Sequence, residues 1–306
     1  MSFSFDDPAA SRSASPPPSP LSSPPSLPSL SSVSSLSSLP ASRSLPLAAD
    51  IAAVVGRLRA AGCVFAEDEA GLLLSAARTP AELAALVERR ACGHPLEHVL
   101  GWAEFCGLRV AVEPGVFVPR RRTEFLVRQA VRTRPDAEVV VDLCCGSGAV
   151  GAALAASLPG CGVELYASDI EPAAVRCALR NLPEGARVFE GDLFEPLPEV
   201  LRGRVDILAA NVPYVPTGEV ALLPAEAREH EPLVALDGGR DGLDVLRRVT
   251  AEAGEWLAPG GILLFETSER QTAGALSAVA DGGLAPGADR CDERYATVVV
   301  GTRTTR

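Results

Sequence analysis

The sequence contains no lysine, and all 28 of its cationic residues are arginine. This absence excludes a lysine nucleophile and a Schiff-base lysine from the catalytic chemistry. Acidic residues outnumber the arginines, and the resulting formal charge of −11 disfavours non-specific binding to nucleic acid. The sequence also lacks an apolar run of the roughly 18 residues that a membrane span requires. We therefore expect no membrane contact and no broad nucleic-acid interface.

Metal-binding and secretory signals are equally scarce. The chain has three histidines and eight cysteines, and no two cysteines form a C-x-x-C pair, so we expect no zinc site. The first residues include the acidic Asp6 and Asp7 and lack the basic and then apolar regions of a secretory signal. We therefore expect a cytoplasmic protein with reduced cysteines.

The N-terminal third divides into segments of different composition. Residues 1–46 are rich in Ser and Pro, which predicts a disordered tail or an over-long translation start. Residues 47–98 are predicted to form a small helical domain, because apolar residues recur at helical spacing from Ile51 to Leu58. Leu72–Leu74 suit a second helix. A third begins at Thr79-Pro80, an N-cap followed by a proline in the first turn.

A hairpin is expected to follow, within a connector over residues 99–121. Its predicted strands are Glu104–Val112 and Val116–Val118, with the turn at Glu113-Pro114-Gly115. The remaining residues, 122–306, would form a second domain.

Apolar strands and helices alternate along this second domain. Such alternation predicts an α/β fold with a mostly parallel sheet covered by helices on both faces. In this fold, ligands bind beyond the carboxyl ends of the strands. The predicted strands are 139–141, 163–167, 188–190, 205–209, 261–265 and 295–300, and the predicted helices are 149–158, 172–182, 242–257 and 269–280.

A glycine-rich turn follows the first predicted strand, in the segment Val141–Gly148. Gly146 and Gly148 allow a tight turn and a close approach of the backbone to a ligand at a helix N-terminus. The G-x-G-x-x-G pattern of dinucleotide sites is absent. The segment therefore favours a nucleotide-like ligand, and the alternative is a tight turn that binds nothing.

Acidic residues end the next two strands. Asp169 lies about 20 residues beyond the glycine turn, where a carboxylate suits ribose hydroxyls, although it could also serve as a helix cap. Asp192 could accept from an exocyclic amine while Leu193 lines an apolar adenine slot. An ordinary turn at Asp192 is the alternative.

The fourth motif is Asn211-Val212-Pro213-Tyr214, at the end of an apolar strand. An amide nitrogen is a poor nucleophile because its lone pair is conjugated with the carbonyl group. Two acceptors around its hydrogens, the Asn211 side-chain oxygen and a backbone carbonyl, would favour pyramidalisation and direct the lone pair. Tyr214 would stack on the planar substrate. The alternative is an Asn-x-Pro turn without a catalytic role.

The order of these motifs resembles that in the protein-(glutamine-N5) methyltransferases, the HemK or release-factor glutamine methyltransferase family. Three further segments, Gly93–Gly101, Val118–Glu124 and Glu231–Leu243, are similar to the family's own. The resemblance implies a class I S-adenosylmethionine-dependent methyltransferase with a Rossmann-like, seven-stranded, mostly parallel sheet. The helical domain would then recognise the substrate.

The resemblance also implies the roles of individual residues. Asn211, Pro213 and Tyr214 would be catalytic, and Asn211 through Tyr214, including Val212, would bind the substrate amide. S-adenosyl-L-methionine would be the cofactor, and the partner would be a protein with an exposed glutamine, such as a release factor, bound by a monomer. The implied cofactor-binding residues are Cys144, Cys145, Gly146, Ser147, Gly148, Asp169, Asp192, Leu193 and Asn211.

The sequence departs from the family at a few positions. Cys144 replaces the usual first glycine of the turn, and Val212 replaces the first of two prolines. Arg121 and Arg122 stand where a proline and an acid are frequent. Two alternatives stay open: an N6-adenine or N4-cytosine methyltransferase acting on RNA or DNA, and a non-catalytic S-adenosylmethionine-binding protein.

Overall fold

The computed structural model describes residues 48–159 and 162–305, and the predicted Ser/Pro-rich tail lies outside them. The described chain begins with helices α1 (Ala48–Ala60), α2 (Ala66–Ala76), α3 (Pro80–Ala91) and α4 (Leu96–Leu100). The predicted start of α3 is confirmed, because the Thr79 side chain accepts from the Glu82 backbone N–H and Pro80 opens the helix. Leu58, Leu73 and Val87 bring α1, α2 and α3 into one small apolar core.

The next element is a hairpin of β1 (Trp102–Phe105) and β2 (Leu108–Ala111). A hairpin is present, but its turn and its second strand were predicted at the wrong residues. The chain reverses at Cys106-Gly107, where φ is +50° and +75°, and not at Glu113–Gly115. Two consecutive residues of positive φ suit the right-handed twist of a two-residue hairpin turn. Val116–Val118 is consequently not a strand, and Val116 and Phe117 line a pocket.

A seven-stranded sheet forms the main core of the described residues. Its order is β5-β4-β3-β6-β7-β9-β8, in which the first five strands are parallel and the last two pairings are antiparallel. The predicted α/β fold with a mostly parallel sheet is thereby confirmed. The strands are β3 (Val139–Leu143), β4 (Glu164–Asp169), β5 (Arg187–Glu190), β6 (Val205–Ala210), β7 (Leu257–Thr267), β8 (Ala285–Cys291) and β9 (Ala296–Thr302).

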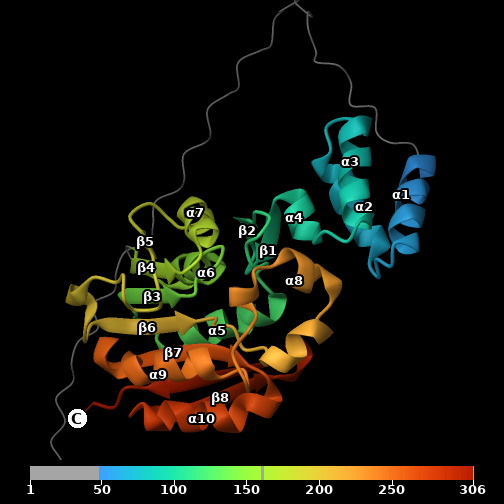
Figure 1. Ribbon diagram of the computed structural model, residues 1–306. Helices are drawn as coiled ribbons and strands as arrows, with labels where there is room; N and C mark the ends of the chain where they lie inside the picture. Colours follow the sequence, from blue (N-terminus) through green and yellow to red (C-terminus); the bar gives the residue numbers. More distant parts are fainter. Residues whose placement is uncertain (1–47, 160–161, 306) are drawn as a thin grey trace, which may run out of the picture. The chain divides into compact units, whose positions relative to one another are not determined.

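Helices cover both faces of this sheet (Figure 1). Side chains of β3 alternate between the two faces and are buried on both, as expected for a central parallel strand. On one face α5 (Glu124–Thr133), α6 (Ala149–Ser157) and α7 (Pro172–Asn181) pack around residues such as Val140. On the other, α9 (Asp244–Trp256) and α10 (Thr272–Asp281) enclose Val141 and Phe265.

Shorter helical turns lie in the connections. Between β6 and α9 the chain forms η3 (Thr217–Leu222), α8 (Ala225–His230) and η4 (Leu233–Ala235). The other short turns are η1 (Arg121–Thr123), η2 (Glu199–Leu201), η5 (Glu269–Gln271) and η6 (Asp292–Arg294). None of the helices in the described part of the chain is both long enough and apolar enough to span a membrane.

The topology has one consequence for the position of a site. The strand order reverses between β3 and β6, since the chain moves outward from β3 to β5 and then returns to the other side of β3. The loops after β3 and β6 therefore diverge from a common edge, which is the usual ligand-binding crevice of such sheets.

Candidate active site

The turn after β3 contains three residues with positive φ angles, which residues with a Cβ rarely adopt. Gly146 and Gly148 have φ of +54° and +77°, and Cys144 adopts +54° although it carries a Cβ. Gly148 also approaches α7 closely, because a Cβ there would lie 3.1 Å from the Ala178 Cα. The prediction that these glycines allow a tight turn is thus consistent with the geometry. At positive φ the Cβ of Cys144 lies close to its own backbone, which costs free energy. Gly146 and Gly148 have no Cβ and avoid this cost.

Asp169, at the end of β4, holds this turn against the neighbouring strand. Its carboxylate accepts from the backbone N–H of Gly146 at 2.8 Å and of Glu171 at 2.9 Å. Burial raises the pKa of Asp169, whereas these two N–H groups act in the opposite direction. Each carboxylate oxygen has a further lone pair, so Asp169 can accept two more hydrogen bonds from a ligand.

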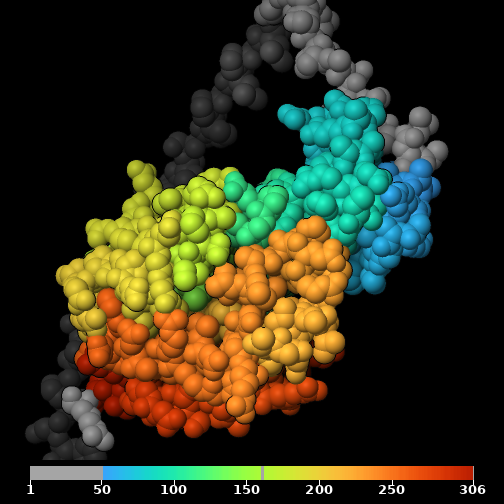
Figure 2. All heavy atoms as spheres, in the orientation of Figure 1, coloured from blue at the N-terminus to red at the C-terminus, as the bar shows by residue number. Residues whose placement is uncertain are grey.

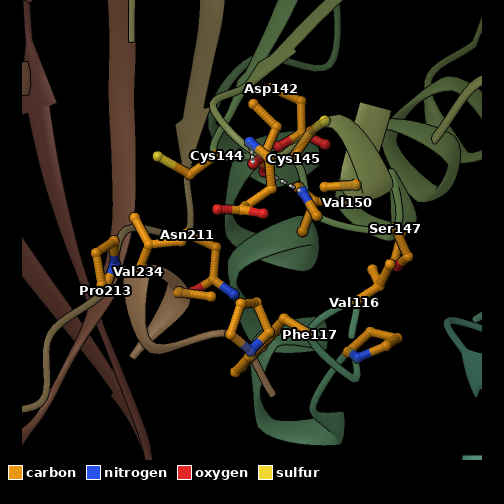
Figure 3. A pocket seen from close by; sticks show the side chains of 18 of the residues that line it. Val116, Phe117, Asp142, Cys144, Cys145, Ser147, Val150, Asn211, Pro213 and Val234 are labelled. Atoms are coloured by element: carbon orange, nitrogen blue, oxygen red, sulfur yellow. Dashed lines mark hydrogen bonds between the residues drawn. The ribbon is translucent and has the colours of Figure 1, made fainter. Parts of the chain in front are cut away.

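A pocket, termed here the turn pocket, lies at this edge of the sheet (Figure 3). Cys144, Cys145, Gly146 and Ser147 line it together with Asp169, Asn211 and Pro213. In Figure 3 the Asn211 side chain extends into the cavity between Cys144 and Phe117. The structure thus gathers residues that lie far apart in the sequence, and their individual roles stay predictions.

Asp192 and Leu193 do not line the turn pocket. Asp192 forms an ion pair with Arg248 at 2.6 Å. Leu193 is buried in the apolar core beneath α9, and its carbonyl oxygen accepts from the Ser168 hydroxyl. Apolar surface in the turn pocket comes instead from Ile170 and Ala174, which follow Asp169 along the chain.

A second pocket, termed the outer pocket, borders the first. Val212 and Tyr214 line it with Arg120, Arg122 and side chains of α8. Three residues, Phe117, Asn211 and Ala235, line both pockets. The two pockets therefore meet at Asn211, so a group held in one can reach a group held in the other.

Asn211 and Val212 keep their acceptors available. Among the described residues, the Asn211 side chain makes no hydrogen bond, and no backbone N–H donates to the Val212 carbonyl oxygen. The Val212 side chain is only 2% exposed and packs in the core, which fixes the backbone at this position. A ligand N–H group would thus find two oxygens without competing donors.

The Tyr214 hydroxyl is fixed by a hydrogen-bond network around the buried Glu266. It donates to Glu266 at 3.0 Å and accepts from Arg122, and Glu266 also accepts from Thr123 at 2.6 Å and from Arg122. Burial and the Glu266 carboxylate raise the pKa of Tyr214 well above its usual range, so the hydroxyl stays protonated. The Gln271 side chain donates from Nε2 to the Tyr214 carbonyl oxygen at 2.7 Å.

Several residues of the site were missed from the sequence. Phe117 and Ala235 carried no chemical signal, although Ala235 belongs to a segment that resembles the family. Asn181 donates from Nδ2 to the carbonyl oxygens of Ala111 and Ser147, both at 2.8 Å, and so ties the hairpin to the glycine turn. A lone asparagine near the end of a helix gave no indication of this role.

Asp142 is a buried acid in the wall of the turn pocket. One of its oxygens accepts from the Gly151 N–H at 2.8 Å, and the other has no partner among the described residues. Burial raises its pKa from 3.8 to about 7, and the nearby Asp169 charge acts in the same direction.

The pKa of Asp142 predicts a pH-dependent stability. The folded protein keeps a proton that the unfolded chain releases between about pH 4 and 7. The free energy of unfolding should therefore fall as the pH rises through this window, by an amount on the order of a few kcal/mol. Urea unfolding of the cofactor-free protein at pH 5 and pH 8 measures the difference. Asp142→Asn should reduce it, and Asp281→Asn, at an exposed position, should not. An unchanged difference in Asp142→Asn would contradict the assignment.

Comparisons with known proteins agree with this architecture. The model of the methyltransferase small domain matches residues 107–225. A release factor glutamine methyltransferase of Geobacter sulfurreducens is 46% identical over 61% of this chain and 66% of the relative. One of Moorella thermoacetica is 42% identical over 68% of this chain and 72% of the relative. The chain spans about two thirds of the length of these relatives.

One relative has a different name. A 4-amino-L-phenylalanine/4-methylamino-L-phenylalanine methyltransferase of Streptomyces pristinaespiralis is 40% identical over 61% of this chain and 65% of the relative. A sequence identity of about 40% to this chain is therefore found also in a protein named for methylation of a small amino acid.

Proposed function

The chain belongs to the release factor glutamine methyltransferase family, and from that membership we propose its reaction. It transfers a methyl group from S-adenosyl-L-methionine to the side-chain amide nitrogen, N5, of a glutamine in a protein, namely a peptide chain release factor. The observation that carries the proposal is the meeting of the two pockets at Asn211. One pocket can hold the cofactor, the other the glutamine, and the reacting atoms meet between them.

The turn pocket has the chemistry that the cofactor requires. Backbone around Gly146 lets the methionine end approach closely, and the free lone pairs of Asp169 suit the ribose hydroxyls. Ile170 and Ala174 offer apolar surface to the adenine. When bound, S-adenosyl-L-methionine supplies an electrophilic methyl group on a sulfonium.

Asn211 and Val212 would prepare the amide nitrogen. The two hydrogens of the glutamine amide donate to the Asn211 side-chain oxygen and to the Val212 carbonyl oxygen, which are free acceptors in the described part of the chain. This arrangement weakens conjugation and directs the lone pair toward the turn pocket. The nitrogen would form the new N–C bond with that lone pair as the bond between the methyl carbon and the sulfonium sulfur breaks and the thioether leaves. The nitrogen would then lose one proton to solvent.

Tyr214 would hold the plane of the amide. Its ring cannot turn freely, because the hydroxyl is bound by Glu266 and Arg122 and the backbone by Gln271. A fixed aromatic face against a planar group lowers the entropy lost on reaching the reactive geometry.

A protein substrate suits the surface around the outer pocket. Leu222 is 80% exposed and Leu233 is 59% exposed, and each is close in sequence to a residue that lines the pocket. Exposed leucines next in sequence to pocket-lining segments add apolar surface that favours a macromolecular partner over a small solute. Figure 2 shows this orange segment around α8 beside the teal helices that precede it.

Labelling tests the proposal directly. We would incubate the full chain with methyl-labelled S-adenosyl-L-methionine and purified release factors, and locate the label by peptide mass spectrometry. We expect the label on one glutamine side chain. Parallel reactions contain total RNA, DNA or 4-amino-L-phenylalanine. Label in one of these and not in a release factor would overturn the proposed substrate, and absence of cofactor binding in calorimetry would overturn the enzyme assignment.

A further inference from the structure

The charged side chains that line the outer pocket are, with one exception, arranged in ion pairs. Glu231 binds Arg120 through both carboxylate oxygens, at 2.6 Å each. Arg122 binds Glu266, which is 3% exposed. These two arginines are therefore already neutralised and offer little net attraction to an acidic substrate.

The third pair involves Glu226 of α8. It binds Arg90 of α3 at 2.7 Å, but Arg90 also binds the buried Glu69 at 2.6 Å. One guanidinium thus serves two carboxylates, and a negative charge remains on this wall after pairing. The link also joins the N-terminal helices to the segment that forms the pocket.

Glu97 is the exception. It is partly buried, lines the outer pocket, and makes no side-chain hydrogen bond or ion pair within the described residues. Its charge still acts on its neighbours. Burial raises the pKa of Glu231, Arg120 opposes this, and the Glu97 charge adds to the increase. Glu97 is therefore close enough to act on the pocket while its carboxylate is left for a ligand.

We infer that Glu97 is a specificity-determining residue that selects methyl acceptors with a cationic side chain next to the reacting nitrogen. The inference rests on the proposed function, because it describes the same outer pocket. A partly buried carboxylate without a partner is costly, and a substrate ammonium or guanidinium would supply the missing counter-charge. The paired arginines would contribute little to this selection. The charge left by the shared Arg90 pairing acts in the same direction as Glu97, but Glu97 is the lining carboxylate that has no partner of its own among the described residues.

The test uses release factor variants in which each residue flanking the labelled glutamine is replaced in turn by Arg, Met or Glu. With the wild-type enzyme we expect kcat/KM to be about tenfold higher for Arg than for Met at one flanking position, from the strength of charge-assisted hydrogen bonds. Glu97→Gln should remove that preference by lowering kcat/KM for the Arg variant about tenfold more than for the Met variant. Glu97→Arg should reverse it, so that the Glu variant becomes the better substrate.

Glu104→Gln is the matched control, because Glu104 is an exposed residue of β1 that does not line the pocket and its replacement removes the same charge. It should keep the preference for Arg. Equal loss for all substrates in Glu97→Gln would indicate a structural role and overturn the inference, as would a wild-type enzyme without charge preference. Failure of the proposed function is seen separately, as a label that is not on glutamine.

Discussion

Replacing Asn211 with alanine is expected to lower kcat by a factor of about 10² to 10³, the usual loss when one preorganised polar group at a reacting centre is removed. The physical reason is that the glutamine amide would lose its side-chain acceptor while the methyl donor stays in place. Cofactor affinity should change much less, because most of the turn pocket lies around Cys144–Ser147 and Asp169. Single-turnover kinetics and calorimetric titration of the cofactor separate the two effects.

Two further variants sharpen this experiment. Asn211→Asp keeps an acceptor oxygen at the same place and should therefore retain more activity than Asn211→Ala. Val234→Ala removes side-chain volume from the same pocket wall without removing a hydrogen-bonding group, and should have a small effect. If Asn211→Ala weakened cofactor binding as much as it slowed turnover, Asn211 would be a cofactor ligand and not the residue that orients the amide.

Gly238→Ala is expected to reduce kcat/KM about a hundredfold in a protein that still folds. A Cβ on Gly238 would lie 2.6 Å from the Pro213 carbonyl oxygen and 2.8 Å from the Tyr214 Cα, so the loop after β6 must move. Displacement of catalytic groups by about 1 Å commonly costs this much in rate. Steady-state kinetics, with circular dichroism to verify folding, measures the effect.

Gly218→Ala provides the control, because a Cβ there meets nothing within 4 Å. Its activity should equal that of the wild type. Gly238 does not line the turn pocket, so Gly238→Ala should bind the cofactor normally. Full activity in Gly238→Ala would show that the loop tolerates the shift and that its exact position does not limit the reaction.

Most of the sheet was predictable because its strands are short buried runs. Val205–Ala209 was predicted and Val205–Ala210 is observed, since this short segment is apolar except for Asp206, which pairs with Arg134. β8 was missed. Ala285–Cys291 contains Pro, Gly and Asp, alternates weakly, and forms an exposed edge strand held through backbone pairing with β9.

The site was predictable only where one segment carried its own chemistry. The glycine turn follows β3, Asp169 ends β4 and Asn211 follows β6, and the parallel topology brings all three to one edge of the sheet. The network around Tyr214 depends on Arg122 and Glu266, which are 144 positions apart and whose approach no local pattern reveals. Asp192 was predicted either to face the adenine or to be an ordinary turn residue, and its ion pair with Arg248, 56 positions away, likewise had no local signal in the sequence.

The shared walls of the two pockets matter for the design of inhibitors. A single molecule with one part in the turn pocket and the other in the outer pocket would pass directly by Asn211, Phe117 and Ala235. Such a bisubstrate ligand loses its translational and rotational freedom once, where two separate ligands lose it twice. A short linker would make the second contact effectively intramolecular, and the charge chosen for the outer part would then set the selectivity of the compound.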